Sequence, residues 1–305
     1  MSVHGWIILD KPVGMGSTQG VAAVKRNLRE AGFNMKLKGG IKVGHGGTLD
    51  PLASGILPIA VGEATKITGR MLDASKIYDF TITFGAETDT LDLEGQVIAT
   101  SDVLPGATEV AGVLPQFTGP IEQVPPAYSA LMIDGVRAYD RARAGEVVDM
   151  PTRAVTIYTL DLLDADAGCV TLRAFVSKGT YIRSLARDIA LALGTRGHVT
   201  MLRRIKAGPF GLDQAISLDK LNEVGKGARL EHILLPLEAG LVDIPALPLS
   251  PEAARAVRQG RVLTGQPHSD GLYLASLGAT PVALMVVDGG SARVERGFNF
   301  SDVAE

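Results

Sequence analysis

Cysteine is almost missing from this chain, because its 305 residues contain only Cys169. A single cysteine excludes an intramolecular disulfide, so the sequence predicts a protein of a reducing compartment, the cytoplasm. The N-terminus has no basic region followed by a long apolar run, and we therefore expect no secretory signal. Nor is there an apolar run long enough to cross a bilayer, so we expect no membrane partner.

Metal and nucleotide motifs are missing as well. The five histidines are scattered, and there is neither a His-Glu-x-x-His motif nor a pair of cysteines. The sequence therefore predicts no metal site. Its glycine-rich stretch lacks the Gly-Lys-Ser/Thr ending of a P-loop, and Rossmann spacing is absent. We expect no cofactor.

An excess of positive charge is also missing, since the formal net charge is −3. Total charge is weak evidence against nucleic-acid binding, because phosphate responds to the local field. Basic side chains do gather in two later groups, and at this point a solvated surface is an equally good interpretation of each. The groups are Arg137, Arg141 and Arg143, and then Arg196, Arg203, Arg204 and Lys206.

The most informative stretch is residues 44–55, which holds four glycines in twelve residues. Glycine weakens helices and strands, so this stretch predicts a loop that bends sharply or approaches another group closely. Pro51 fixes its own φ angle and biases Asp50 away from helical geometry. A carboxylate held in this way can act as a nucleophile or a base. An ordinary turn with a solvated Asp50 is the alternative.

Two periodic segments follow this loop. Residues 76–85 alternate between apolar and polar side chains and predict a half-buried strand that begins near Tyr78. Apolar residues between 182 and 193 lie on one helical face, and Gly194 fits the end of that helix. Arg183 lies in its first turn, where a positive charge opposes the helix dipole. An anionic partner would offset that cost, and Asp50 is the candidate.

Three less regular regions complete the chain. A short helix beginning near Thr108 contains Pro115, which either kinks or ends it. Residues 124–151 lack clear periodicity and combine arginine with tyrosine, which suits a functional loop that pairs with phosphate and stacks on bases. From residue 236 prolines punctuate a linker, and short apolar runs then predict a small β-barrel with a hairpin at residues 288–290.

Several stretches together resemble the TruB family of tRNA pseudouridine synthases, over roughly residues 5–240. The matching stretches are residues 44–55, Gly62-Glu63-Ala64-Thr65-Lys66, the Lys-x-Tyr pattern ending at Tyr78, Lys178-Gly179-Thr180-Tyr181-Ile182-Arg183, and residues 197–204. The resemblance implies an α+β pseudouridine synthase fold, with a mixed and mostly antiparallel central sheet flanked by helices and loops. It implies a catalytic domain at 1–240, with a thumb-like loop at about 124–151, and a PUA-like RNA-binding domain at 241–305.

The resemblance also implies an activity, the isomerisation of uridine 55 in the T arm of tRNA to pseudouridine. Asp50 would be the nucleophile on a flipped-out uridine, and attack on C6 or on C1′ are both open. Arg183 would keep Asp50 charged and oriented, and Tyr78 would complete the catalytic set. The substrate-binding residues implied are His45, Tyr78, Tyr181 and Leu202.

The RNA contacts implied by the resemblance lie outside this catalytic set. They are Arg137, Arg141, Arg143, Lys178, Arg203 and Arg204. We expect the T stem-loop of tRNA as the partner of a monomeric chain, with no obligatory protein partner. Two other classes stay open at this stage, namely an RNA-binding protein without catalysis and an aspartate-nucleophile hydrolase using Asp89 or Asp92 as a second carboxylate. A guide-RNA-dependent enzyme would require partner proteins.

Overall fold

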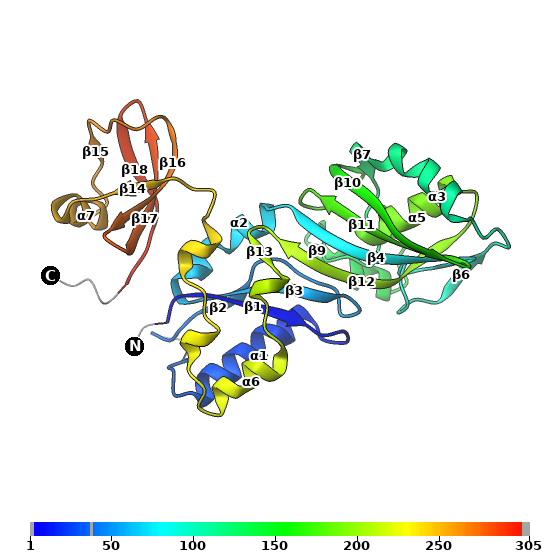
Figure 1. The fold of residues 1–305 in the computed structure, drawn as a ribbon, viewed down its shortest axis with the longest axis horizontal. Helices are drawn as coiled ribbons and strands as arrows, with labels where there is room; N and C mark the ends of the chain where they lie inside the picture. Colours follow the sequence, from blue (N-terminus) through cyan, green and yellow to red (C-terminus); the bar gives the residue numbers. More distant parts are fainter. Residues whose placement is uncertain (1–2, 37–38, 301–305) are drawn as a thin grey trace.

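The computed structural model describes residues 3–36 and 39–300, which form two main sheets and two short ribbons (Figure 1). The larger sheet has nine strands, and its neighbours are antiparallel except for one parallel pair, β3 with β12. In spatial order its main path is β1 (Gly5–Lys11), β3 (Ser54–Val61), β12 (Gly197–Ala207), β4 (Lys76–Phe84), β11 (Cys169–Val176), β10 (Arg153–Asp166) and β7 (Gly119–Gln123). Two short strands extend it, β2 (Val43–His45) on β3 and β13 (Phe210–Gly211) on β12.

Helices flank this sheet, as the α+β prediction requires. The α-helices are α1 (Ser17–Glu30), α2 (Thr68–Asp73), α3 (Ala107–Val113), α4 (Ala138–Arg143), α5 (Ile182–Ala192), α6 (Leu218–Gly225) and α7 (Pro251–Arg258). Shorter 3-10 turns occur at Gly62–Ile67, Leu114–Phe117, Leu212–Gln214, Leu230–His232 and Leu237–Gly240. Among the helices of residues 3–36 and 39–300, none combines the length and the apolar character needed to cross a membrane.

The two periodic segments form the elements that their patterns predict. Along β4 the side chains of Phe80, Ile82 and Phe84 are buried, and they share a core with Leu185 and Ile189 of α5. Each such side chain stabilises the fold by about 1.5–3 kcal/mol when it is removed from water. This packing fixes the start of α5 against the centre of the sheet.

A second core lies under the other end of the sheet, where α1 and α6 pack against β1 and β3 (Figure 1). Val24 and Leu28 of α1 meet Leu57 of β3 and Leu221 of α6. The chain enters the sheet here through β1 and returns here after β12. Segments before the loop (β1 and α1) and a segment far after it (α6) therefore pack together around β3 and fix the loop that carries Asp50.

The C-terminal region forms a separate curled sheet, as predicted. Its five strands follow the order β14 (Ala246–Pro248), β16 (Gly271–Leu277), β17 (Thr280–Asp288), β18 (Ser291–Gly297) and β15 (Leu263–Thr264). The hairpin between β17 and β18 turns at Gly289 and Gly290, whose φ angles of 54° and 75° suit glycine. The domain boundary between residues 240 and 241 stays a prediction.

This curled sheet is joined to the larger one by a common core. Leu274, Leu284 and Phe298 from the C-terminal sheet pack in the same cluster as Trp6 and Met71. The Trp6 indole also donates a hydrogen bond to the carbonyl of Leu237, at 3.1 Å. A continuous apolar contact of this kind holds the two sheets in one arrangement.

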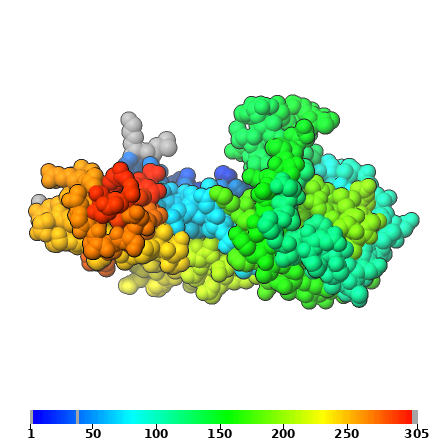
Figure 2. Space-filling model, turned by 90° about the horizontal axis from the view of Figure 1, so that it is seen from above, coloured from blue at the N-terminus to red at the C-terminus, as the bar shows by residue number. Residues whose placement is uncertain are grey.

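The segment at 124–151, here called the thumb segment, is more regular than the sequence indicated. It contains the paired strands β8 (Met132–Ile133) and β9 (Val136–Arg137), followed by α4. The prediction of an irregular stretch was wrong because it overlooked Asp134-Gly135, a favoured hairpin turn, whose φ angles are 49° and 81°. In Figure 2 this segment, green on the colour scale, stands out from the body of the molecule.

Two smaller questions from the sequence are also answered. Pro115 ends the helix rather than kinking it, because α3 stops at Val113 and a 3-10 turn takes over. The acidic stretch after β5 (Ala86–Thr88) turns back into β6 (Val97–Thr100), so these strands form a hairpin. The turn of this hairpin brings Thr90 and Asp92 to the start of α5.

Candidate active site

Asp50 stands on the boundary between two cavities. The smaller has a volume of about 310 Å³ and is lined by Asp50, Tyr78, Tyr181, Arg183 and Leu202 together with neighbouring backbone. The larger, of about 770 Å³, is also lined by Asp50 and Arg183 and extends to the thumb segment. The structure therefore brings five of the predicted catalytic and substrate-binding residues together in one cleft.

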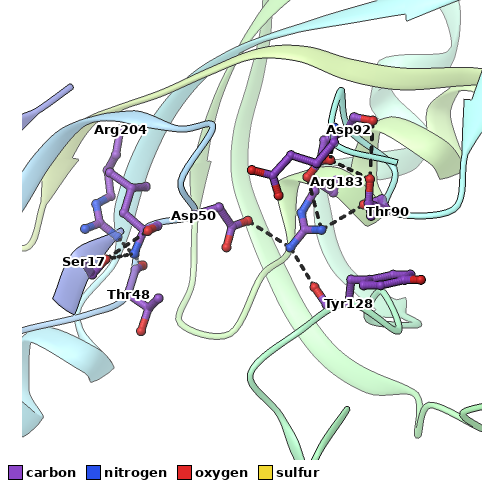
Figure 3. Close-up of polar contacts among 10 residues, drawn as sticks. Ser17, Thr48, Asp50, Thr90, Asp92, Tyr128, Arg183 and Arg204 are labelled. Atoms are coloured by element: carbon purple, nitrogen blue, oxygen red, sulfur yellow. Dashed lines mark hydrogen bonds and ion pairs between the residues drawn. The ribbon is translucent and has the colours of Figure 1, made fainter. Parts of the chain in front are cut away.

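Arg183 is the most heavily bonded side chain of this cleft (Figure 3). Its side chain is only 7% exposed, and one Nη atom lies 2.9 Å from the Asp50 carboxylate and 3.0 Å from the Tyr128 carbonyl. The other Nη atom donates to the Thr90 carbonyl at 2.8 Å and lies 3.3 Å from Asp92. The predicted ion pair between the first turn of the helix and Asp50 is confirmed.

Asp92 is a site residue that the sequence did not assign to this cleft. It is 6% exposed, and its Oδ1 atom accepts hydrogen bonds from the Thr90 hydroxyl at 2.6 Å and from the Glu94 N–H at 3.0 Å. These contacts leave Oδ2 directed at Arg183. The sequence offered Asp92 only as a possible second carboxylate of a hydrolase, and no spacing linked it to an arginine 91 positions away.

The side chain of Arg204 holds the loop that carries Asp50. This side chain is 1% exposed, and it donates to the carbonyls of Ile56 at 2.7 Å, Thr48 at 3.1 Å and Gly47 at 3.4 Å. Its burial argues against the predicted contact with RNA, because the guanidinium is already occupied by backbone. We assign Arg204 to the shape of the loop, which Figure 3 shows beside Asp50.

Two side chains from the N-terminal part of the chain, Lys11 and Ser17, also hold this loop. The Lys11 ammonium, fully buried, donates to the carbonyl of Pro51 at 3.3 Å. The Ser17 hydroxyl accepts from the Leu49 N–H at 2.8 Å and donates to the Leu49 carbonyl at 2.9 Å. Burial lowers the pKa of Lys11 to about 8, although the charge of Asp50 opposes that shift. The carboxylate is thus presented by a rigid turn.

The uncharged members of the site have shifted pKa values too. Burial lowers the pKa of His45, and the positive charge of Arg204 lowers it further, so its imidazole is neutral at pH 7. His45 lines the larger cavity, and its buried Nδ1 atom has no hydrogen-bond partner within the described residues. Burial raises the pKa of the Tyr181 hydroxyl, which keeps its proton.

The remaining predicted RNA contacts are spread around the cleft. Arg203 forms a two-point ion pair with Asp10 at 2.8 and 3.0 Å. Lys178 pairs with Asp73 at 2.8 Å, and both side chains are exposed. The thumb arginines form looser contacts and are described next.

Of the three thumb arginines, Arg137 and Arg143 line the larger cavity and lie over the ring of Tyr139. Arg141 approaches Asp134 and Glu146 at 3.6 and 3.5 Å. The thumb segment therefore directs cationic side chains toward the same opening that exposes Asp50.

Known proteins resemble this chain over its whole length. The model of the TruB family pseudouridylate synthase N-terminal domain matches residues 33–182, and that of the tRNA pseudouridylate synthase B C-terminal domain matches residues 183–242. A tRNA pseudouridine synthase B from Novosphingobium aromaticivorans is 69% identical, over 99% of this chain and 100% of the relative. The chain belongs to the TruB family. The predicted membership is confirmed, and as a TruB-family member the chain is an isomerase, a tRNA pseudouridine synthase.

Other relatives extend this result to the fold. A second tRNA pseudouridine synthase B, from Zymomonas mobilis, is 56% identical over 98% of this chain and 97% of its own. Among solved structures, a chain of an H/ACA RNP bound to a substrate RNA containing 2′-deoxyuridine is 27% identical, with a TM-score of 0.71. The match covers 98% of this chain and 86% of that one. The predicted TruB-type fold, with its curled C-terminal sheet, is confirmed.

Proposed function

We propose that this TruB-family enzyme isomerises uridine 55 in the T arm of tRNA, with Asp50 as the nucleophile. The observation that carries this proposal is the 2.9 Å ion pair between Asp50 and Arg183 at the mouth of a cleft walled by Tyr78 and Leu202. A volume of about 310 Å³ suits a single flipped nucleotide, while the larger cavity beside it suits the loop from which the nucleotide comes.

The chemistry begins with extrusion of the uridine, which costs roughly a few kcal/mol of stacking and pairing. The uracil enters the smaller cavity against Tyr78 and Leu202, and the neutral ring of His45 occupies the stack on the other side of Asp50. The Asp50 carboxylate, oriented by Arg183, then attacks the nucleoside at C6 or C1′. The C1′–N1 bond breaks, the base turns and a C1′–C5 bond forms. The bond between Asp50 and the nucleoside breaks and returns the carboxylate, and the proton lost from C5 is balanced by one gained on N1.

Asp92 supports this arrangement by sharing Arg183 with Asp50. A buried guanidinium bound to one carboxylate and two carbonyls cannot swing away when the substrate arrives. Because the group is already in place, little reorganisation is needed as charge moves in the transition state. Asp50 thus carries out the reaction, and Asp92 keeps Arg183 aligned with it.

RNA binding would fall mainly to the thumb segment and the cleft edge. The guanidinium groups of Arg137, Arg141 and Arg143 and the ammonium of Lys178 suit phosphate oxygens. The similar chain of known structure belongs to a ribonucleoprotein, whereas we propose that this chain acts on tRNA as a monomer without a protein partner. Turnover by the purified chain alone tests that difference.

Primer extension that detects pseudouridine in unmodified tRNA tests the proposal. The wild-type chain should modify position 55, whereas Asp50→Asn should bind the tRNA with nearly unchanged affinity and form no product. Asp219→Asn, an exposed change on α6, serves as the matched control and should keep full activity. Product formation by Asp50→Asn, or modification at another position by the wild type, would contradict the proposal.

A further inference from the structure

Lys76 is a buried cation in the smaller cavity that the proposed chemistry has not used. It begins β4 and is 8% exposed, and it lines the cavity together with Asp50 and Tyr78. Side chains two positions apart on a strand point to the same face, so Lys76 and Tyr78 share one wall. A group that approaches the ring of Tyr78 from inside the cavity therefore meets the side chain of Lys76 as well.

The ammonium of Lys76 has no carboxylate within ion-pair distance among the described residues. It donates to the carbonyls of Leu72 at 2.7 Å and Ala74 at 2.5 Å, which accounts for two of its three N–H donors. Within residues 3–36 and 39–300 it forms no ion pair, and the nearby Asp73 is paired with Lys178. Burying a charge without a counter-ion is costly, and a ligand that supplies negative charge would offset part of that cost.

The electrostatic surroundings make that cost larger. Burial and, to a smaller extent, the positive charge of Arg204 lower the pKa of Lys76 to about 8, although the negative charge of Asp73 opposes that shift. At pH 7 the amine still carries its proton, so a group that enters the cavity meets a cation whose third N–H donor is available. A negative oxygen in contact with the third N–H would relieve this imbalance.

That oxygen belongs to the base rather than to a phosphate. The cavity has the volume of one nucleotide, and it is lined by apolar side chains such as Leu72 and Leu202 and by the charged side chain of Asp50. A phosphodiester inside this cavity would lie beside the Asp50 carboxylate, which repels it, whereas a uracil lying against Tyr78 brings neutral carbonyl oxygens there. The exposed cations of the cleft edge are better placed for phosphate.

We infer that Lys76 is a further catalytic residue, whose ammonium donates a hydrogen bond to a carbonyl oxygen of the uracil and stabilises the charge on the departing base. This inference rests on the proposed function. When the C1′–N1 bond breaks, its electron pair passes to the base, and the uracil oxygens share the negative charge. Formation of the C1′–C5 bond and transfer of a proton from C5 to N1 restore neutrality, without a co-reactant. A preorganised donor of this kind is worth about 10²–10³-fold in rate.

Single-turnover kinetics and RNA affinity separate this role from others. Lys76→Met should lower the rate of pseudouridine formation about 100-fold while the Kd for tRNA changes less than threefold, because the lost interaction strengthens only as charge develops. Lys76→Arg should restore part of the rate. Lys220→Met removes an exposed lysine paired with Glu223 and is the control that should match wild type. A rate within threefold of wild type, or a loss in Kd equal to the loss in rate, would overturn the inference.

A second substrate distinguishes charge stabilisation from support of the last turn of α2, whose carbonyls Lys76 also holds. In RNA with 5-fluorouridine at the target position the fluorine stabilises the base anion, so cleavage of the C1′–N1 bond should be less sensitive to Lys76→Met. An equal loss on both substrates would indicate misplaced structure and would refute the catalytic role. If Lys76→Met does not fold, Lys76→Gln, which keeps a donor without the charge, replaces it in both measurements.

The two proposals fail in different ways. If the wild-type chain forms no pseudouridine in tRNA, the proposed function is wrong. If the wild type is active, Asp50→Asn is inactive and Lys76→Met behaves as wild type, only the inference about Lys76 is wrong.

Discussion

The cleft and the thumb segment both contain arginines, but those of the cleft are buried and tightly hydrogen-bonded, whereas those of the thumb segment are loosely held. In the cleft, Arg183 and Arg204 are nearly inaccessible and their donors are occupied by several partners at 2.7–3.4 Å. In the thumb segment, Arg141 meets its carboxylates only at 3.5–3.6 Å, and Arg143 lies over a tyrosine ring. Fixed cations suit a reaction with one geometry, and solvated cations suit an RNA backbone that differs from one substrate to the next.

Arg183→Ala tests the fixed side of this comparison and should have the largest effect. It leaves Asp92 buried without its cation and Asp50 without its guide, so turnover should fall about 10²–10³-fold, roughly 3–4 kcal/mol. Single-turnover kinetics with saturating enzyme would measure this loss. Arg173→Ala breaks a comparable arginine–aspartate pair, with Asp79, outside the cleft and should change turnover little. If the two variants lost turnover equally, the arginine of the cleft would have no special role in the reaction.

Gly55→Ala tests whether the loop itself must be rigid. Gly55 has a φ angle of +102°, and an added Cβ would lie 2.2 Å from the carbonyl oxygen of Arg204. The clash should cost about 3 kcal/mol of folding stability and lower activity with it. Denaturant unfolding would show this. Gly44→Ala, in the same motif but with open space around it, is the control and should be tolerated. A stable, active Gly55→Ala variant would show that the loop does not need this close approach to the backbone of Arg204.

Lys11 should make the stability of the cleft depend on pH. Because its pKa falls from 10.5 to about 8 on folding, the folded chain binds fewer protons than the unfolded one between these values. The free energy of unfolding of the wild type, relative to Lys11→Met, should therefore rise by on the order of 2 kcal/mol between pH 7 and pH 10. The difference in denaturant midpoints across this range measures it. A difference that stays flat or shrinks would show that Lys11 is not a buried charge.

Arg141→Ala tests the solvated side and should have the smallest effect. Removing one phosphate contact should weaken tRNA binding about five- to tenfold and reduce the slope of log Kd against log salt by about one, with no change in the single-turnover rate. Lys220→Ala removes the same charge from α6 and should leave the slope unchanged. An affinity independent of salt would remove the case for the thumb segment as a phosphate-binding element.

Local pattern was sufficient for the parts of the site that lie on regular elements. Alternation placed Tyr78 at the start of a strand, and the apolar stripe placed Arg183 in the first turn of a helix. The helix dipole then required an anion near Arg183, which pointed to Asp50. These inferences hold because each depends on neighbours within a few positions.

The parts that the sequence missed depend on contacts between distant segments. Arg204 was grouped with Arg203 as a basic surface, yet the strand that carries both turns Arg204 beneath the glycine-rich loop. Asp92 reaches Arg183 only because the turn of the β5–β6 hairpin lies against β12, where Asp92 pairs with Val199. No periodicity encodes such meetings, because they arise when the sheet assembles.

The contact between Trp6 and the C-terminal sheet limits how the two sheets can move against each other. Leu274, Leu284 and Phe298 share the apolar cluster around Trp6, and Arg70 adds an ion pair to Asp243 at 2.7 Å. Neither sheet can move away from the other without exposing this apolar cluster to water and breaking that ion pair.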